Sequence, residues 1–155
     1  MNDLTERPNR IPWPPILFAG AALVALGLEW VVPTSHGGYG VVRALGAVLA
    51  AGGLSLDVWT ALTFRRHATT IMPHRGADRL ATDGPFRFSR NPIYLGNTLM
   101  VIGLGLAFDW LWAIPAALVA AVAVSRLAIA REERHLEARF GQAWRDYAGR
   151  VRRWL

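Results

Sequence analysis

Four apolar segments constrain the fold of this chain more than any other feature of its sequence. An α-helix rises about 1.5 Å per residue, so a helix of roughly 20 apolar residues crosses the hydrocarbon core of a bilayer. The segments that approach or exceed this length are residues 16–32, 41–64, 92–108 and 110–130. Of the 155 residues, 53% are hydrophobic and only 18% are charged, which is atypical of a soluble domain. The sequence therefore predicts an all-α integral membrane protein, one domain over residues 1–155 with four transmembrane helices.

The arginines predict how this helical bundle is oriented. All 17 basic residues are arginine, and the formal net charge is +6. Two lie in the N-terminal segment, six in the connector 65–91 and seven in the tail 131–155, whereas the loop 33–40 and the turn at Asp109 contain none. The positive-inside rule then places both termini, the connector and the tail in the cytoplasm. Because the arginines flank apolar spans, we expect them to contact anionic lipid headgroups and not nucleic acid.

Four ionisable residues fall inside the predicted spans, where such groups usually pair or serve a function. Glu29 and Arg43 both lie near the outer face, and we predict a structural ion pair between them. Asp57 and Arg126 both lie near the inner face, close to the arginine-rich connector. Each of these two is either a structural anchor, with Arg126 extending to the headgroups, or part of a site.

The stretch before the third span predicts a helix start that favours anions. Asn91 is a good N-cap residue, and Pro92 is favoured at the first helical position. A helix N-terminus carries partial positive charge, and Arg90 adds a full one, so a carboxylate or phosphate is favoured nearby. The alternative interpretation is a capped membrane helix whose arginine lies among lipid headgroups.

The C-terminal tail predicts two further helices. Residues at three- and four-residue steps indicate that the helix of the fourth span continues out of the membrane as far as Gly141. These residues are Arg126, Ile129, Glu132, Glu133, Leu136 and Phe140. Local ion pairs with Arg131 and Arg134 are the alternative role for the two glutamates. A second amphipathic helix is predicted to lie on the bilayer surface, with Trp144, Tyr147, Val151 and Trp154 on one side.

Several other chemistries are excluded or disfavoured by the sequence. There is no cysteine, so disulfides, thiolate catalysis and cysteine-ligated metals are excluded. We predict no metal site, because His67 and His74 lack a third ligand at suitable spacing. The Gly103-Leu104-Gly105 motif lies within an apolar span without a preceding strand, so it indicates close helix packing and not a nucleotide-binding loop.

The second half of the chain resembles the membrane-embedded methyltransferases that include isoprenylcysteine carboxyl methyltransferase and the phospholipid N-methyltransferases. The resemblance covers residues 64–152, and its strength lies in the order of its parts. These are GPFRFSRNPIY at 84–94, EERHL at 132–136, FG at 140–141, Trp144, Tyr147 and Arg150-Val151, while Thr69, Thr70 and Pro73 resemble the bacterial branch. A bacterial inner membrane is therefore the expected location. Asn91 stands where the prenylcysteine enzymes carry histidine, so prenylcysteine specificity is not implied.

The resemblance implies an S-adenosylmethionine cofactor held between the connector and the helix that leaves the membrane. The cofactor-binding residues that it implies are Arg90, Asn91, Pro92, Tyr94, Glu132 and Glu133. We also expect His135 to bind the cofactor, and the expected catalytic residues are Arg90, Glu133 and Arg126. The acceptor is expected to be a lipid or lipophilic carboxylate or amine that enters between helices. Arg126 is a candidate to hold a carboxylate acceptor, and His135 or Asp57 a candidate base for an amine.

Three other functions fit parts of the sequence. A four-span proton-coupled transporter would use Glu29 as its coupling site, but it leaves the connector and tail without a role. A membrane reductase of related fold would bind a nicotinamide cofactor, and a non-catalytic assembly subunit would bind none. The Gly- and Ala-rich spans are also compatible with a homodimer.

Overall fold

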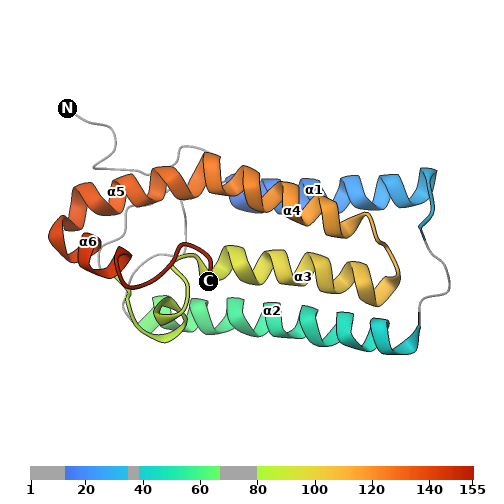
Figure 1. The fold of residues 1–155 in the computed structure, drawn as a ribbon, viewed down its shortest axis with the longest axis horizontal. Helices are drawn as coiled ribbons and strands as arrows, with labels where there is room; N and C mark the ends of the chain where they lie inside the picture. Colours follow the sequence, from blue (N-terminus) through green and yellow to red (C-terminus); the bar gives the residue numbers. More distant parts are fainter. Residues whose placement is uncertain (1–12, 35–38, 67–79) are drawn as a thin grey trace.

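The computed structural model describes residues 13–34, 39–66 and 80–155, and within these ranges it is a bundle of helices without strands (Figure 1). The elements are α1 (Trp13–Val31), α2 (Gly40–Arg66), the 3-10 helix η2 (Gly84–Arg87), α3 (Pro92–Phe108), α4 (Ala113–Val124), the π-helical turn η3 (Ser125–Ile129), α5 (Ala130–Phe140) and α6 (Gln142–Ala148). The predicted all-α class is confirmed. The predictions made for His67, Thr69, Thr70, Pro73 and His74 concern positions outside the described residues.

Three helical stretches in the described part of the chain are long and apolar enough to cross a membrane. They are Pro14–Val31, Gly40–Arg66 and Ala113–Phe140. The remaining apolar helix, α3, has 17 residues and is therefore about 25 Å long, at the short end of the range for a transmembrane helix. Figure 1 shows α2 and α3 side by side, with η2, α5, α6 and the C-terminus gathered at one end of the bundle.

Helices α2 and α3 approach each other at backbone contact because glycines line their interface. A Cβ atom added at Gly53 would lie 2.5 Å from the carbonyl oxygen of Gly96, and one added at Gly103 would lie 2.4 Å from the backbone nitrogen of Ala50. Real Cβ atoms do not approach other atoms so closely, so only glycine fits at these positions. The packing role predicted for Gly103 is consistent with this contact. This interface fixes α3, and hence the position of its N-terminus, relative to α2.

Glu29 has a structural role at the opposite end of the bundle, but not through the predicted ion pair. Its carboxylate accepts hydrogen bonds of 2.6 Å from both the backbone N–H and the hydroxyl of Thr34. The same hydroxyl accepts a 3.0 Å hydrogen bond from the backbone N–H of Leu111. Arg43 is exposed, and no Glu29–Arg43 ion pair occurs among the described residues. Glu29 instead connects the end of α1 to the turn between α3 and α4.

The fourth apolar segment and the charged tail form one long helical stretch, as the sequence predicts. Helix α4 continues through η3 into α5 without a break, and α5 ends at Phe140, directly before Gly141 (Figure 1). The turn before α4 also matches its prediction, because Asp109 adopts the left-handed conformation that ends α3, with φ of 63°. The π-helical turn was not predicted. Such turns are rare and occur often at functional sites.

The predicted interfacial helix at the C-terminus is wrong in its extent and in its contacts. Helix α6 ends at Ala148, so Val151 and Trp154 are not helical. Trp144 and Tyr147 are buried in a cluster with Ala81 and do not lie on a bilayer surface. The spacing of these aromatic residues reflects packing of a short helix against the connector. The residues after α6 turn back toward the start of α3 and form part of the candidate site.

Gly141 permits the turn that brings α6 against the connector, so Gly141→Ala is expected to destabilise the protein by about 1–3 kcal/mol. The backbone of Gly141 has φ of 52° and ψ of −120°, which a residue with a Cβ adopts only with strain. A Cβ there would meet no atom within 4 Å, so strain is the sole cost. The control is Gly149→Ala, where φ is −72°. Chemical unfolding in detergent should show a lower stability for the first variant only; equal stabilities would contradict the assigned strain.

Candidate functional site

The connector, α5 and α6 pack together at one end of the helical bundle, where they enclose a small aromatic core. Phe86, Trp144 and Tyr147 are buried there together with Ala81. The hydroxyl of Tyr147 donates a 2.8 Å hydrogen bond to the backbone carbonyl of Phe86. Burial raises the pKa of Tyr147, and the positive charge of Arg90 opposes this rise only in part. Tyr147 is therefore a neutral hydrogen-bond donor that fastens α6 to η2.

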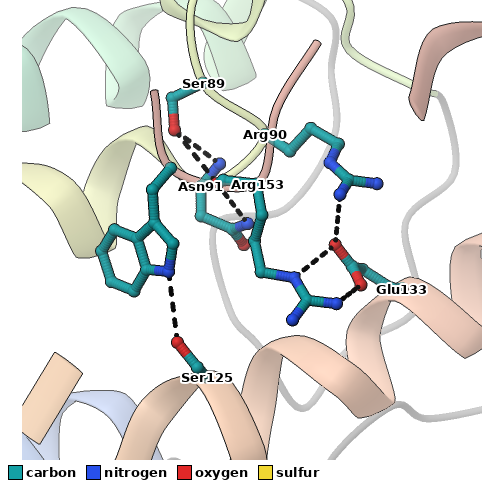
Figure 2. Close-up of polar contacts among 7 residues, drawn as sticks. Ser89, Arg90, Asn91, Ser125, Glu133 and Arg153 are labelled. Atoms are coloured by element: carbon teal, nitrogen blue, oxygen red, sulfur yellow. Dashed lines mark hydrogen bonds and ion pairs between the residues drawn. The ribbon is translucent and has the colours of Figure 1, made fainter. Parts of the chain in front are cut away.

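The last residues of the chain pair with the residues that precede α3. We call residues 149–155 the C-terminal segment. The backbone N–H of Arg90 donates a 3.0 Å hydrogen bond to the carbonyl of Arg152. The carbonyl of Arg153 accepts hydrogen bonds from the side chains of Ser89, at 3.4 Å, and Asn91, at 3.0 Å (Figure 2). Asn91 occupies the N-cap position, as predicted, but its side chain binds the C-terminal segment and makes no capping hydrogen bond.

A three-residue ion cluster lies directly beside this pairing. Arg153 donates hydrogen bonds from Nε, at 3.1 Å, and from Nη2 to the two carboxylate oxygens of Glu133 (Figure 2). Nη2 of Arg90 lies 3.3 Å from Oε1 of the same carboxylate. The hydrogen bonds to Glu133 raise the pKa of Arg153. One carboxylate from α5 therefore holds two guanidinium groups, one from each of the paired segments.

The environment of Arg90 leaves it with unused binding capacity. Its guanidinium lies over the ring of Trp144, with Cζ 5.7 Å from the ring centroid, as in a cation–π contact. Its side chain is only 16% exposed. Its Nε is buried and has no hydrogen-bond partner among the described residues. A buried donor without an acceptor is costly, so an oxygen atom brought to this nitrogen by a shift of the Arg90 side chain would be stabilised.

The ion cluster forms one wall of a cavity of about 520 Å³ that is widely open to the surroundings of the protein. Small-molecule sites in proteins typically have volumes of roughly 300–1,000 Å³. The cavity is lined by Arg90, Ala130, Glu133, Arg134, Glu137, Trp144, Arg145, Ala148 and Arg153. Four arginines face two glutamates, so the cavity is electropositive, and Trp144, which is only 5% exposed, contributes a small aromatic part of its wall. This donor set suits a ligand with an anionic group, a cationic group and an apolar ring.

The structure brings Arg90 and Glu133 together from distant parts of the chain, as the predicted site requires. The other residues predicted from the sequence lie outside the lining of this cavity. Pro92 is fully buried at the start of α3. The hydroxyl of Tyr94 donates a 2.8 Å hydrogen bond to Oε1 of Glu132. The two neighbouring glutamates of α5 therefore face different surroundings, and only Glu133 lines the cavity.

Three further candidates lie apart from the cavity. Arg126 is in η3 with an exposed side chain, and His135 is buried within α5. Asp57 lies on α2 and packs its carboxylate against Gly96 of α3. Oδ1 of Asp57 is buried without a hydrogen-bond partner in the described part of the chain. None of these three side chains lines the cavity.

Sequence reasoning missed Arg153, although it belongs to the cluster. The tail contains arginines at positions 150, 152 and 153, and nothing local distinguishes one from another. The distinguishing contact is the hydrogen bond from Asn91, 62 residues away. Trp144 was assigned to a bilayer-facing surface, because the aromatic residues around it repeat at helical spacing.

Fold and site together define a helical membrane protein with an electropositive cavity at the end of its bundle. The family model described as phospholipid methyltransferase matches residues 41–143. This range covers more than half of the chain and includes α3, α4 and all of α2 except its first residue, together with the elements that carry Arg90 and Glu133. The protein therefore belongs to the phospholipid methyltransferase family, a family of membrane methyltransferases.

Two curated proteins are similar to this chain. One is the nickel-cobalt-cadmium resistance protein NccN of Alcaligenes xylosoxydans xylosoxydans, which is 30% identical over 118 residues. That alignment covers 76% of this chain but only 54% of NccN, so the chain spans about half the length of that relative. The other is an uncharacterised protein of Haemophilus influenzae, 39% identical over 67 residues, which are 41% of this chain and all of that protein. No solved structure shows a significant match to this chain.

Proposed function

We propose that this protein is an S-adenosylmethionine-dependent methyltransferase that acts on a lipid or lipophilic acceptor at the cytoplasmic face of a membrane. The observation that carries the proposal is the cavity in which Arg90 and Glu133 meet, in a chain of the phospholipid methyltransferase family. The proposed topology has four spans, including the short helix α3, with both termini in the cytoplasm. The arginine-rich elements then lie on the cytoplasmic side, as the positive-inside rule requires.

The residues of the cavity fit the chemistry of this methyl donor. When bound, the donor supplies a methyl group on a sulfonium, and its amino-acid part carries a carboxylate and an ammonium. Arginine binds carboxylates through paired N–H donors, and a glutamate binds an ammonium. Arg90 would hold the carboxylate, Glu133 would hold the ammonium, and the ring of Trp144 would pack against an apolar part of the ligand. These contacts orient the donor, and positioning is the main contribution of a protein to a displacement reaction.

The proposal leaves two classes of acceptor, which differ in their need for a base. A carboxylate attacks the methyl group directly, whereas an ammonium must first lose a proton. Transfer to a carboxylate should therefore vary little between about pH 6 and 9 when the donor is saturating. Transfer to an amine should rise with pH until the amine is deprotonated. The pH profile of methyl incorporation into extracted lipid separates these two classes.

The direct test is donor binding by the purified protein in detergent. We expect isothermal titration calorimetry to show saturable binding of S-adenosylmethionine and none of NADPH. With methyl-labelled donor and native membrane lipids, label should appear in the organic phase. Binding of NADPH in place of S-adenosylmethionine would favour the reductase, and binding of neither would refute the proposed enzyme.

A further inference from the structure

The carboxylate of Glu133 orients two arginines without using up their hydrogen-bonding capacity. It engages Nε and Nη2 of Arg153 and Nη2 of Arg90. Each guanidinium carries five N–H donors, so both arginines retain donors that this carboxylate does not reach. Two positive charges also face one negative charge in the cluster. The cluster is therefore prepared for a second anion.

The other two arginines of the cavity are less suited to that anion. Arg145 donates from Nε and Nη2 to the side chain of Gln142, at 3.1 and 3.0 Å, and its Nη1 lies 3.4 Å from Glu137. Its side chain is 53% exposed, so water screens its charge. Arg134 donates from Nε to the backbone carbonyl of Ala130 and is exposed. Arg90 and Arg153 are therefore the two arginines of the cavity that are best able to bind a further anion.

The C-terminal segment holds Arg153 in place through contacts on both of its sides. Asn91 and Ser89 bind the carbonyl of Arg153 itself. On the following residue, the indole N–H of Trp154 donates a 3.2 Å hydrogen bond to the hydroxyl of Ser125 in η3. Because the backbone is fixed on each side, the Arg153 side chain is directed at the cavity although it is 42% exposed.

We propose that Arg153 and Arg90 together bind the carboxylate of the methyl donor, and that Asn91 is a positioning residue that keeps Arg153 at the cavity. This assignment rests on the proposed function. Glu133 holds the two guanidiniums side by side, and the remaining lone-pair position of its carboxylate would accept a hydrogen bond from the ammonium of the same ligand. The C-terminal segment is then part of the cofactor site, and a chain that lacks it would have an incomplete site.

The test compares two donors that differ only in the carboxylate. S-adenosylmethionine and its decarboxylated form are titrated into wild-type protein, Arg153→Met and Arg153→Lys in detergent. We expect Arg153→Met to weaken S-adenosylmethionine binding by roughly 10-fold or more, as for loss of a hydrogen bond to a charged group. Binding of the decarboxylated donor should change by less than about 2-fold, which is within the effect of a surface substitution. Arg153→Lys should fall between wild type and Arg153→Met, because lysine keeps the charge but not the fork of donors.

The matched control is Arg152→Met, which removes the same charge from the neighbouring exposed side chain. It should bind both donors as wild type does. If Arg153→Met weakens the binding of both donors equally, or weakens the binding of neither, the assignment is overturned while the proposed function stays intact. If wild-type protein binds neither donor, the proposed function itself fails, and this inference fails with it. If Arg153→Met does not fold, Arg153→Lys decides by the same comparison.

Discussion

Replacing Arg90 with alanine is expected to lower the affinity for S-adenosylmethionine by roughly 100-fold, the largest effect of any single side chain in the cavity. Arg90 is less exposed than Arg153, at 16% against 42%, so water screens its charge less. It also packs on Trp144 and has a buried Nε without a partner among the described residues. Removal of Arg90 therefore takes away a group that binds the carboxylate of the donor. It also leaves Glu133 paired with one arginine, Arg153, in place of two.

The control for this variant is Arg87→Ala, which removes an exposed arginine from the same connector. Calorimetric titration of both proteins in one detergent should show near wild-type affinity for Arg87→Ala. Arg90→Lys should recover only part of the loss, because an ammonium cannot reproduce the planar fork or its stacking on the indole. Wild-type affinity in Arg90→Ala would remove the cavity from consideration as the donor site.

The parts of the fold that the sequence predicted are those fixed by local chemistry. Pro92 and Asn91 mark the start of α3, Asp109 forms the turn after it, and Gly141 ends α5. Each of these follows from the backbone preference of one residue or from a missing N–H. The meeting of Arg90 and Glu133 was implied by a resemblance to a family and not by local chemistry.

The C-terminal segment was mispredicted because its conformation depends on distant partners. The aromatic spacing from Trp144 to Trp154 is compatible with a helix, and nothing local opposes one strongly apart from Gly149. Hydrogen bonds from Ser89, Arg90 and Asn91 draw these residues away from a helix. Hydrogen bonds between residues so far apart along the chain do not produce a repeating pattern that can be recognised in a single sequence.

The position of Arg126 shows a second limit of prediction from the sequence, which concerns the face of the helix on which a residue lies. A periodic pattern drawn from Arg126 to Phe140 assumes about 3.6 residues per turn throughout. The π-helical turn Ser125–Ile129 is wider than an α-helical turn, so it rotates the later residues about the helix axis. Within the turn Arg126 is exposed and Ile129 is fully buried, and after the turn Glu133 faces the cavity. The pattern therefore applies to α5, after the turn, but could not be carried back into the turn to place Arg126.

Two neighbouring glycines of α2 are expected to respond to alanine in opposite directions. At Gly53, a Cβ would lie 2.5 Å from the carbonyl oxygen of Gly96 and 2.9 Å from the backbone nitrogen of Met100, so Gly53→Ala must push α3 away. Overpacking of this kind typically costs about 1–3 kcal/mol. At Gly52, a Cβ would meet no atom within 4 Å. Gly52→Ala should therefore stabilise the helix by roughly 0.5–1 kcal/mol.

The same pair of variants also tests whether the cavity depends on the packing of α2 against α3. Helix α3 begins directly after Asn91, next to Arg90, so a shift of α3 moves that arginine relative to Glu133 on α5. We expect Gly53→Ala to lower both the thermal stability in detergent and the affinity for S-adenosylmethionine, and Gly52→Ala to lower neither. Lower stability with unchanged affinity in Gly53→Ala would show that the cavity does not depend on this interface. Equal behaviour of the two variants would contradict the backbone contact itself, because the substitutions are chemically identical and adjacent in one helix.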